Sequence, residues 1–559
     1  MNSERLLDAF NRLGDGPETV QQFRKLVVGL AMSGKLVAPD EAALAPSSLL
    51  KEIETRKRVL VQQGALRNQS PLSAVSLEDL PKGFTDPSSF VRLGEIARIE
   101  KGQTGIMKAE PGAYPLVVTA EERGTCDHFD FEGSAAIVPL VSSAGHGKAS
   151  LQRLHYQEGK FALGSILAAI FPHAPELISA RFLFEYLTSF KDELLVSQMI
   201  GTANVSLSVG KVSHVPVPLV PPLVQRKVDE LMGLCDRLES AWAGREGVRD
   251  RLAAASLARL NVPDPETFEV DARFAHDALP SLTARPDQIK ALRQTILNLA
   301  VRGKLVPQNE KDEPAAELLK RIAKERQRRV KSSRAPSLSR VATATSLPEG
   351  WTDATLAELA IFENGDRSSN YPSGADILGS GVAFFSTKNL SGHKLHFTNL
   401  DYISEAKFAS LRSGKLQDHD ILVTLRGSVG KFGLFRASEE IKTGFINAQL
   451  LIVRSLLPQF VDFLLTFMKS EVFSTQLDTR ASGSATPQLS AGQLAQVVIS
   501  LPPLAEQHRI VAKVDALMAL CDRLEASLTA TASTRRRLLD ALLAEALAPV
   551  DAREMEAAE

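Results

Sequence analysis

The chain has 559 residues, too many for one hydrophobic core, so several domains are expected. Its composition, 44% hydrophobic and 23% charged, is ordinary for a globular protein, and a formal net charge of −1 means that any basic surface for nucleic acid must be local. Three cysteines exclude a disulfide framework and favour the cytoplasm, and we expect neither a signal peptide nor a membrane-spanning segment.

The first 220 residues predict a helical frame followed by an α/β domain. Residues 1–84 contain two expected helices, within "FRKLVVGLAMSGKLV" and "SSLLKEIETRKR", and end at "LPKGF". Residues 85–220 carry the β-rich runs "YPLVVTA", "AAIVPLVSS" and "SILAAIF", and then the amphipathic stretch "ARFLFEYLTSFKDELL", which predicts a helix. This second segment has a normal size for one domain.

The rest of the chain repeats this order. Residues 221–346 hold the helical phrase "KVDELMGLCDRLESA", a second frame with "LRQTILNLAVRGKLV" and "AELLKRIAKERQ", and a basic, serine-rich linker from residue 326 to 346. Residues 347–501 predict a second α/β domain with "GVAFFST", "HDILVTL", "KFGLFRA" and "AQLLIVR", followed by one helix, "FVDFLLTFMKSEVFSTQL". Residues 502–559 predict a long terminal helix, from about Pro503 to Ala546.

Matching phrases show that the chain is an internal duplication. "KVDELMGLCDRLESA" returns as "KVDALMALCDRLEAS", "LPKGF" as "LPEGW", and "GTANVSLSVGKV" as "GSATPQLSAGQL", all in the same order. The frames match closely, whereas the two α/β domains match only at their edges. The long period indicates two large halves rather than a solenoid array.

The two long helices each carry a heptad seam. Apolar residues recur at alternating spacings of three and four, which is the pattern of a coiled coil. We therefore expect the helices to pair as an intramolecular antiparallel coiled coil with pseudo-twofold symmetry, and the alternative is that each packs separately into its own half. The seam residues are Val228, Leu231, Cys235 and Leu238 in the first copy, and Val514, Leu517, Cys521, Leu524 and Leu528 in the second.

Matched frames that carry different domains suit two different half-sites on DNA, because the duplex backbone has twofold symmetry. Three stretches, "LPPLAEQHRIVAKVDALMALCDRLE", "LRQTILNLAVRGKLVPQNEKDEPAAELLKRI" and the pattern "ILVTLRGSVGKFG", "NAQL", "GSATPQLS", resemble the specificity (S) subunits of type I restriction–modification enzymes. The likeness implies an α+β fold with two α/β target recognition domains, separated by long conserved helices.

The same resemblance implies the activity and the partners. Each target recognition domain would read one half of a bipartite, asymmetric site on double-stranded DNA. The conserved helices would set the spacing and bind two methyltransferase (M) subunits, and restriction (R) subunits would join for cleavage. No cofactor is expected on this non-catalytic chain: S-adenosylmethionine belongs to the methyltransferase partner, and ATP and Mg belong to the nuclease partner.

The two copies differ at the start of the long helix. After "PPL" the second copy reads "AEQHRIVAKVD" and the first reads only "VQRKVD", so the first copy is five residues shorter. Five helical residues make about 1.4 turns. We therefore expect the first helix to begin differently and to alter the placement of the first recognition domain.

The loops of both α/β domains contain candidate DNA contacts. Arg and Lys bind phosphates and guanine, Asn and Gln suit adenine, and glycine-rich loops allow close approach of the backbone. Any one of these side chains could instead be a solvated loop residue. The candidates in the second domain are Arg426, Ser428, Lys431, Lys388, Asn389, Arg480, Ser482, Ser484, Thr486 and Gln488; those in the first are Ser142, Ser143, His146, Lys148, Thr202, Asn204 and Lys211.

We find no enzyme motif in the sequence. "SAGHGKAS" lacks the first glycine and the Ser or Thr after lysine that a phosphate loop needs, and no zinc-type spacing of Cys and His is present. Cys235 and Cys521 lie on the heptad seams and are expected to be small buried hydrophobes. We expect no catalytic residue and no metal; the contrasting hypothesis is a structural adaptor whose domains bind proteins and no DNA.

Overall fold

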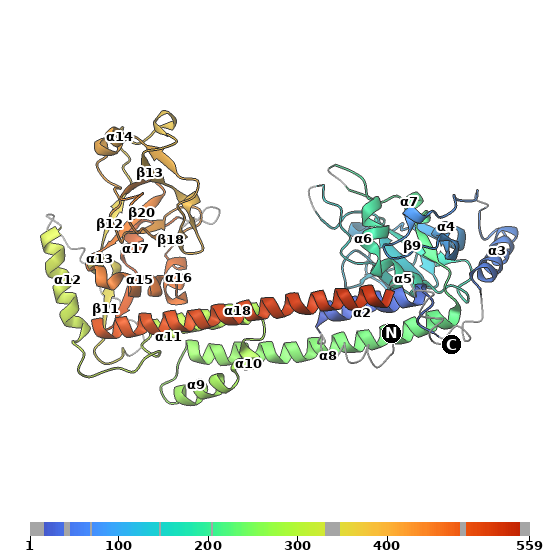
Figure 1. Ribbon diagram of the computed structural model, residues 1–559, viewed down its shortest axis with the longest axis horizontal. Helices are drawn as coiled ribbons and strands as arrows, with labels where there is room; N and C mark the ends of the chain where they lie inside the picture. The colour runs from blue at the N-terminus through green and yellow to red at the C-terminus, as the bar shows by residue number, and fades with distance from the viewer. Residues whose placement is uncertain are drawn as a thin grey trace, which may run out of the picture. The chain divides into compact units, whose positions relative to one another are not determined.

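The computed structural model describes residues 16–37, 45–67, 70–144, 147–202, 205–329, 347–480 and 488–547 (Figure 1). They divide into two compact units. The first contains the described residues up to Gly247 and those from Thr531 onward, and the second contains Val248–Ala530. Both units combine helices and β-sheets, so the chain is α+β as expected. None of the helices in the described ranges is both long and apolar enough to cross a membrane.

The frame of the first unit consists of α2 (Pro17–Met32) and α3 (Pro46–Gln62). Both helices begin with proline, where the missing N–H leaves no intrahelical bond unmade. The apolar face of α2 packs against α5 (Ala180–Ser189), which is the helix predicted within "ARFLFEYLTSFKDELL". One hydrophobic core therefore joins the frame to the α/β domain.

The α/β domain of the first unit contains two four-stranded sheets. The first has the strand order β2-β9-β6-β7 and is antiparallel throughout; the second has the order β4-β3-β8-β5, with β3 and β8 parallel. The strands are β2 (Ala97–Lys101), β3 (Tyr114–Val117), β4 (Gly124–Cys126), β5 (Phe131–Glu132), β6 (Ala135–Pro139), β7 (His155–Gln157), β8 (Lys160–Leu163) and β9 (Leu167–Pro172), and β1 (Phe90–Arg92) pairs with β10 (Pro216–Pro218).

The second unit repeats this topology. Its main sheet has the order β12-β20-β17-β18, and its second sheet has the order β16-β13-β19, again with one parallel pair, β13 and β19. The strands are β12 (Ala360–Asn364), β13 (Val382–Phe385), β16 (Asp401–Ile403), β17 (Ile421–Thr424), β18 (Phe432–Leu434), β19 (Gly444–Ile446) and β20 (Leu450–Ser455); β11 (Thr352–Thr355) pairs with β21 (Val498–Leu501), and β14 (Leu390–Ser391) with β15 (Lys394–Leu395).

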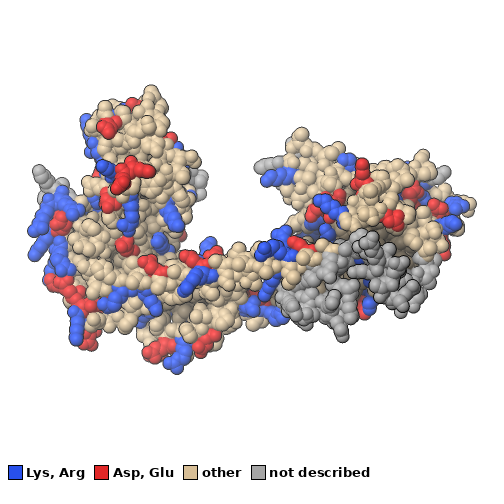
Figure 2. Space-filling model, in the orientation of Figure 1, with Lys and Arg blue, Asp and Glu red and all other residues tan. Residues whose placement is uncertain are grey.

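Helices frame the sheets of the second unit as well. Helix α11 (Pro286–Val301) corresponds to α2, and α12 (Ala315–Arg329) corresponds to α3. Figure 2 shows Lys and Arg side chains gathered on α12, which gives this helix a local basic surface. The shorter helices of the chain are α4 (Leu93–Ile96), α6 (Lys191–Leu194), α7 (Val209–Ser213), α9 (Phe268–Asp277), α10 (Leu279–Leu282), α13 (Leu356–Leu359), α14 (Glu405–Ser410), α15 (Val461–Met468), α16 (Glu471–Asp478) and α17 (Ala491–Ala495).

One predicted helix of the second unit is two helices. The stretch from residue 460 to 477 breaks between α15 and α16, and Ser470 forms the N-cap of α16. Asn298 of α11 stabilises the break, because its side-chain oxygen accepts from the backbone N–H of Glu471 (3.0 Å) and its amide donates to the Glu471 carboxylate (2.9 Å). Periodicity could not locate this break, since the partner residue lies far away in the sequence.

The two long helices are α8 (Pro222–Asn261) and α18 (Leu504–Leu547), close to the predicted bounds of the terminal helix. The first turns of each pack into the core of their own unit: Val228 lies in the first core, and Val514 and Cys521 lie in the second. Farther along the seam of α18, Leu524 is 41% exposed. The first part of each seam therefore packs within its own unit, and a later part of the α18 seam is exposed. The pairing of α8 with α18 stays a prediction.

The duplication is visible in one polar contact of the first unit. Arg24 of α2 reaches across to α8, where one Nη atom lies 2.6 Å from Asp236 and 2.9 Å from Glu239. Its other Nη atom lies 3.7 Å from the sulfur of Met232. Burial alone would lower the pKa of Arg24, but the hydrogen bonds and charges of Asp236 and Glu239 outweigh it and raise the pKa above its ordinary value.

The second unit makes the same contact with the repeated residues. Arg293 of α11 lies 2.7 Å from Asp522 and 3.0 Å from Glu525, and 3.9 Å from the sulfur of Met518. Each of these residues stands at the position that the sequence repeat assigns to its counterpart in the first unit. The duplicated phrase therefore encodes one contact, which holds the frame helix against the long helix in both units.

Candidate nucleic-acid interface

A short loop, residues 425–431, joins β17 to β18 at one end of the main sheet of the second unit. The hydroxyl of Thr424 fixes its shape, since it accepts from the backbone N–H of Lys431 (3.0 Å) and donates to the Ser428 carbonyl. Gly427 and Gly430 have φ of 77° and 79°, a left-handed conformation that favours glycine. Arg426, Ser428 and Lys431 are therefore presented on an ordered turn, and all three side chains are exposed.

A second segment lies beside this loop. The backbone N–H of Leu489 donates to the Leu425 carbonyl (2.9 Å), and Arg426 and Gln488 form an antiparallel bridge. The exposed side chains of Arg426 and Gln488 thus stand next to each other. Within the described part of this edge, neither Arg426 nor Lys431 makes an ion pair, which leaves both cations available for phosphate or base edges.

The first unit has the same pair of segments. Its loop between β6 and β7, residues 140–154, is longer, and it is held by the bond from Leu207 N to Leu140 O (2.8 Å) and by the bond from Ser142 N to Val205 O (2.9 Å). The backbone frame of the two edges is therefore shared, while their exposed side chains differ. Among the residues predicted to contact DNA, Ser143, Lys148 and Thr202 are exposed here.

Two further exposed residues were missed by the sequence reasoning. The backbone carbonyl of Gln449 accepts from Leu425 N (3.0 Å), and its side chain accepts from the Thr387 hydroxyl (3.4 Å), so Gln449 links the loop to the segment that carries Lys388. Arg367 lies beside it and donates to the Ala448 carbonyl (3.0 Å). The phrase "NAQL" contained the signal for Gln449, whereas nothing in the sequence placed Arg367 at this edge.

The structure shows internal partners for several of the predicted contacts in the second domain. Asn389 is 1% exposed, and its side chain accepts from Ser386 N (3.0 Å) and donates to the Thr398 carbonyl, so it shapes the turn and is not available to a base. Arg480 is half-buried and donates to the Gln476 carbonyl (2.8 Å) at the end of α16. Lys388 is exposed but paired with Asp401 (2.8 Å).

Two predicted contacts of the first domain also have internal partners. The Ser142 hydroxyl donates to the Lys148 carbonyl (2.6 Å) and accepts from Ser150 N (3.1 Å), which closes the loop between β6 and β7. The ammonium group of Lys211 donates to the Gln198 carbonyl. These side chains support the loops instead of projecting from them. The remaining predicted contacts, His146, Asn204, Ser482, Ser484 and Thr486, lie outside the described residues.

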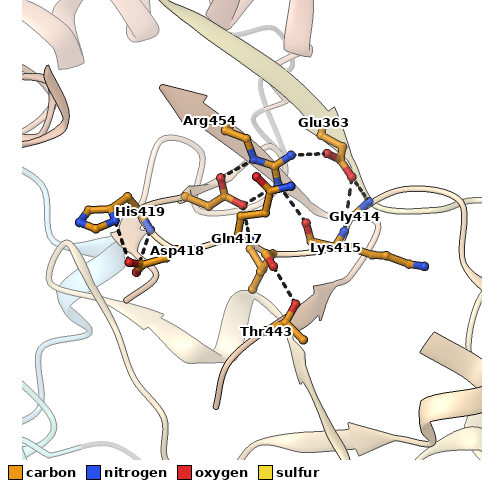
Figure 3. A network of polar contacts seen from close by, with 10 residues as sticks. Glu363, Gly414, Lys415, Gln417, Asp418, His419, Thr443 and Arg454 are labelled. Atoms are coloured by element: carbon orange, nitrogen blue, oxygen red, sulfur yellow. Dashed lines mark hydrogen bonds and ion pairs between the residues drawn. The ribbon is translucent and has the colours of Figure 1, made fainter. Parts of the chain in front are cut away.

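The opposite end of the main sheet of the second unit contains a buried polar network (Figure 3). The guanidinium of Arg454 in β20 makes two bonds of 2.7 Å to Asp420, which is fully buried, and one of 3.1 Å to Glu363 in β12. Glu363 also accepts from Gly414 N (2.6 Å). Burial alone would lower the pKa of Arg454, but the bonds and charges of Asp420 and Glu363 raise it. The network joins β12 and β20 to the segment that precedes β17.

The first unit has aromatic rings at the matching place. Strand pairing aligns Phe171 with Arg454, and Phe171 packs against Phe131 and Phe161 with ring centroids 5.6 and 6.4 Å apart. The guanidinium of Arg98 lies 4.5 Å from the centroid of the Phe171 ring, a cation–π distance. The two sheets therefore share topology but are held together by different chemistry.

Comparisons with known proteins find similarity along most of the chain. Residues 348–532 match the model of the type I restriction modification DNA specificity domain. The chain is 27% identical to the type I restriction enzyme EcoAI specificity subunit of Escherichia coli, over 94% of this chain and 93% of that protein. It is also 27% identical to the EcoEI specificity subunit of Escherichia coli, over 94% of each.

One solved structure, described as "Structural basis underlying complex assembly and conformational transition of the type I R-M system", aligns with 82% of this chain and 97% of its own at 18% identity and a TM-score of 0.49. Over nearly its whole length the chain is similar to specificity subunits of type I restriction enzymes, and residues 348–532 match a DNA specificity domain.

Proposed function

We propose that each unit reads one half of a bipartite DNA site, that the long helices set the spacing of the halves, and that the conserved frames bind two methyltransferase subunits. The chain itself performs no catalysis. Restriction subunits join for cleavage, S-adenosylmethionine is bound by the methyltransferase partner, and ATP and Mg are bound by the nuclease partner.

One observation supports this proposal above the others. The two edges use the same backbone bonds, Leu489 N to Leu425 O in one unit and Leu207 N to Leu140 O in the other, yet present different exposed side chains. Base identity is read by side chains at the groove edges. A shared frame with unlike side chains suits two readers of different sequence, and a protein-binding adaptor gives no reason for it.

The independence of the readers can be tested by exchange. Residues 85–215 are replaced by the same region of a relative, and the methylated motif is read by sequencing host DNA that carries the complete system. We expect one half of the motif to change and the other half to stay. A motif that changes in both halves, or a complex of this chain with its methyltransferase subunits that shifts no duplex in a gel at any salt concentration, would contradict the proposal.

Cationic contacts can be tested through the salt dependence of DNA binding. Lys431→Gln and Arg426→Gln should each weaken binding by the complex with methyltransferase subunits. A phosphate contact should also lower the slope of log affinity against log salt by about one. Lys442→Gln is the matched control, because Lys442 is an exposed lysine of the same unit that follows β18 on a different loop. Equal slopes for all three variants would remove Arg426 and Lys431 from the interface.

The spacing role predicts a length dependence. A matched pair of seven-residue insertions, near Gly244 and near Thr529, keeps the seam in phase and lengthens each helix by roughly 10 Å. That length corresponds to about three base pairs of B-DNA. We expect the methylated half-sites to move apart accordingly, and an active variant with an unchanged spacer would show that the helices only tether the domains.

A further inference from the structure

Three metal-binding side chains converge at the end of β4 in the first unit. They belong to consecutive residues, Cys126, Asp127 and His128, whose donor atoms all lie within 4.8 Å of one another. The sulfur of Cys126 lies 3.4 Å from Nδ1 of His128 and 3.6 Å from Oδ1 of Asp127. Oδ1 and Nδ1 lie 2.7 Å apart. Such proximity of a thiol, an imidazole and a carboxylate needs an explanation.

These distances resemble the edges of a zinc coordination tetrahedron. Zinc–sulfur bonds of about 2.3 Å and zinc–nitrogen or zinc–oxygen bonds of about 2.0–2.1 Å place sulfur about 3.5 Å from the other two ligands, and nitrogen about 3.3 Å from oxygen. Both sulfur distances already agree. The third edge must open by roughly 0.6 Å, which the exposed side chains of Asp127 (53%) and His128 (54%) can accommodate.

A neighbouring residue sets the tautomer of His128. The Thr104 hydroxyl donates to Oδ2 of Asp130 (2.8 Å), so it accepts from Nε2 of His128 (3.2 Å). Nδ1 lies 2.7 Å from Asp127, and the sulfur of Cys126 lies beside the ring, 3.4 Å from Nδ1 and 4.0 Å from Nε2. A ligating histidine that donates its other ring N–H to an outer partner has this arrangement. Asp130 is itself anchored, since its side chain is 7% exposed and also accepts from Leu163 N (2.7 Å).

The ring nitrogen and the carboxylate oxygen lie 2.7 Å apart, a distance at which a proton or a metal cation can lie between them. Cys126, which is fully buried, adds a sulfur to the same point. Protons can bridge these atoms in pairs, as in the contacts of Asp127 with Cys126 and with His128, whereas one cation could bind all three together.

We propose that Cys126, Asp127 and His128 form a binding site for one divalent transition ion of the zinc class, with Thr104 and Asp130 as positioning residues. The thiolate would be the principal ligand, which selects against Mg²⁺ and Ca²⁺ because those ions prefer oxygen. Three ligands leave the fourth position open, and the exposure of Asp127 and His128 directs it towards solvent.

The site lies beside the loop edge of the first unit. Thr104 pairs with Gly164, and its carbonyl accepts from Ser165 N (3.0 Å). The second unit has the bond from Arg367 to the Ala448 carbonyl at the matching position. Cys126 and His128 lie only two residues apart, outside the longer spacings of common zinc motifs. The sequence alone therefore does not reveal the site, because the fold is needed to place Thr104 and Asp130 beside Cys126 and His128.

Cobalt(II) titration of the full-length, metal-free chain tests the proposal directly. We expect one Co²⁺ per chain, with a sulfur-to-cobalt charge-transfer band, and displacement by one equivalent of Zn²⁺. Cys126→Ser should abolish the band, whereas Cys235→Ser, a buried cysteine of the same unit, should retain it. Asp127→Asn and His128→Asn alter exposed side chains, so weaker binding in a variant with unchanged circular dichroism cannot be attributed to unfolding.

The positioning role has its own test. Thr104→Val removes the acceptor for Nε2 and should weaken Co²⁺ binding by about 10–100-fold, a typical loss for an outer partner of a metal ligand, while Thr104→Ser should restore it. Absence of stoichiometric Co²⁺ binding, or a band that survives Cys126→Ser, would overturn the proposal and leave an imidazolium–carboxylate pair. Either result is independent of DNA recognition, which the exchange of residues 85–215 tests separately.

Discussion

Replacement of Arg454 by phenylalanine should destabilise the second unit, although phenylalanine occupies the matching position, Phe171, in the first. The reason lies in Asp420, which is fully buried and receives two bonds from Arg454. Without Arg454, no nearby positive charge offsets the cost of burying the Asp420 carboxylate. Its remaining hydrogen bond comes from the backbone N–H of Gln417 (2.7 Å). Removing one partner of a buried ion pair costs about 3–5 kcal/mol.

Urea unfolding followed by tryptophan fluorescence can measure this loss in the full-length chain. The chain has two tryptophans, and Trp242→Phe leaves only Trp351, which is 7% exposed in the core of the second unit. With an m-value of about 2–3 kcal/mol per molar urea, Arg454→Phe should lower the midpoint by roughly 1–2.5 M. The variant should also lose stability as pH rises, because its folded state favours protonated Asp420.

A second substitution separates lost pairing from lost packing. Ala135 aligns with Asp420 through the strand pairing, so Asp420→Ala together with Arg454→Phe recreates the combination that the first unit tolerates. Apolar replacement of a whole buried pair is often neutral or stabilising. The double variant should therefore unfold at or above the midpoint of the parent. If it unfolds as early as Arg454→Phe alone, the network contributes through shape and not through charge, and the reasoning fails.

Two other predictions concern the frames. Burial raises the pKa of Glu506, although Trp351 and Gln308 donate hydrogen bonds to its carboxylate. Glu506 therefore stabilises the second unit fully below the ordinary carboxyl pKa, and this stabilisation is lost as pH rises through the raised pKa. Glu506→Gln should make the urea midpoint reported by Trp351 decline less with pH. Arg293→Met should lower the free energy of unfolding reported by Trp351 by about 1 kcal/mol or less, the usual value of partly exposed pairs. Arg24→Met in the other unit should leave that free energy unchanged, and equal losses for the two variants would show that the units unfold together.

Sequence patterns located the elements well where the pattern was local. Proline and the seam bounded the long terminal helix to within about one residue of α18, and the β-rich runs became β3, β6, β9, β13, β17, β18 and β20. The edge strands β2 and β12 were not recognised, because "ARIEK" and "AIFEN" are short and only half-buried. Their strand character comes from pairing with β9 and β20, which no local pattern contains.

The candidate interface was predictable at the level of loops and not of side chains. Arg426 and Gln488 lie 62 positions apart, yet both were selected because each stands in a polar, glycine-containing loop. The same criterion selected Asn389 and Arg480, whose polar groups are used inside the protein. Composition of a loop reveals that it turns and is solvated, but whether a side chain bonds inward depends on partners that folding brings near.

The shortening of the first long helix is also resolved by the contacts. Gln225 and Gln507 each donate to a backbone carbonyl five residues earlier, at 2.6 and 2.8 Å, so they mark the same anchor. Val228 follows Gln225 by three residues and Val514 follows Gln507 by seven. Four helical residues make one turn plus about 40°. The seam residues that follow the anchor therefore lie on nearly the same face of the helix in both copies.

The fifth missing residue lies before the anchor, where the chemistry of the two copies changes as well. In the second unit the carboxylate of Glu506 is 1% exposed and accepts from the indole N–H of Trp351 (3.1 Å). The first unit has Phe84 in place of Trp351 and Val224 immediately before its anchor, and both belong to one apolar core. Phenylalanine has no N–H, so a carboxylate there would be buried without that donor. The first unit therefore lacks the donor and the acceptor together, and its frame remains intact although its long helix is about one turn shorter after the anchor.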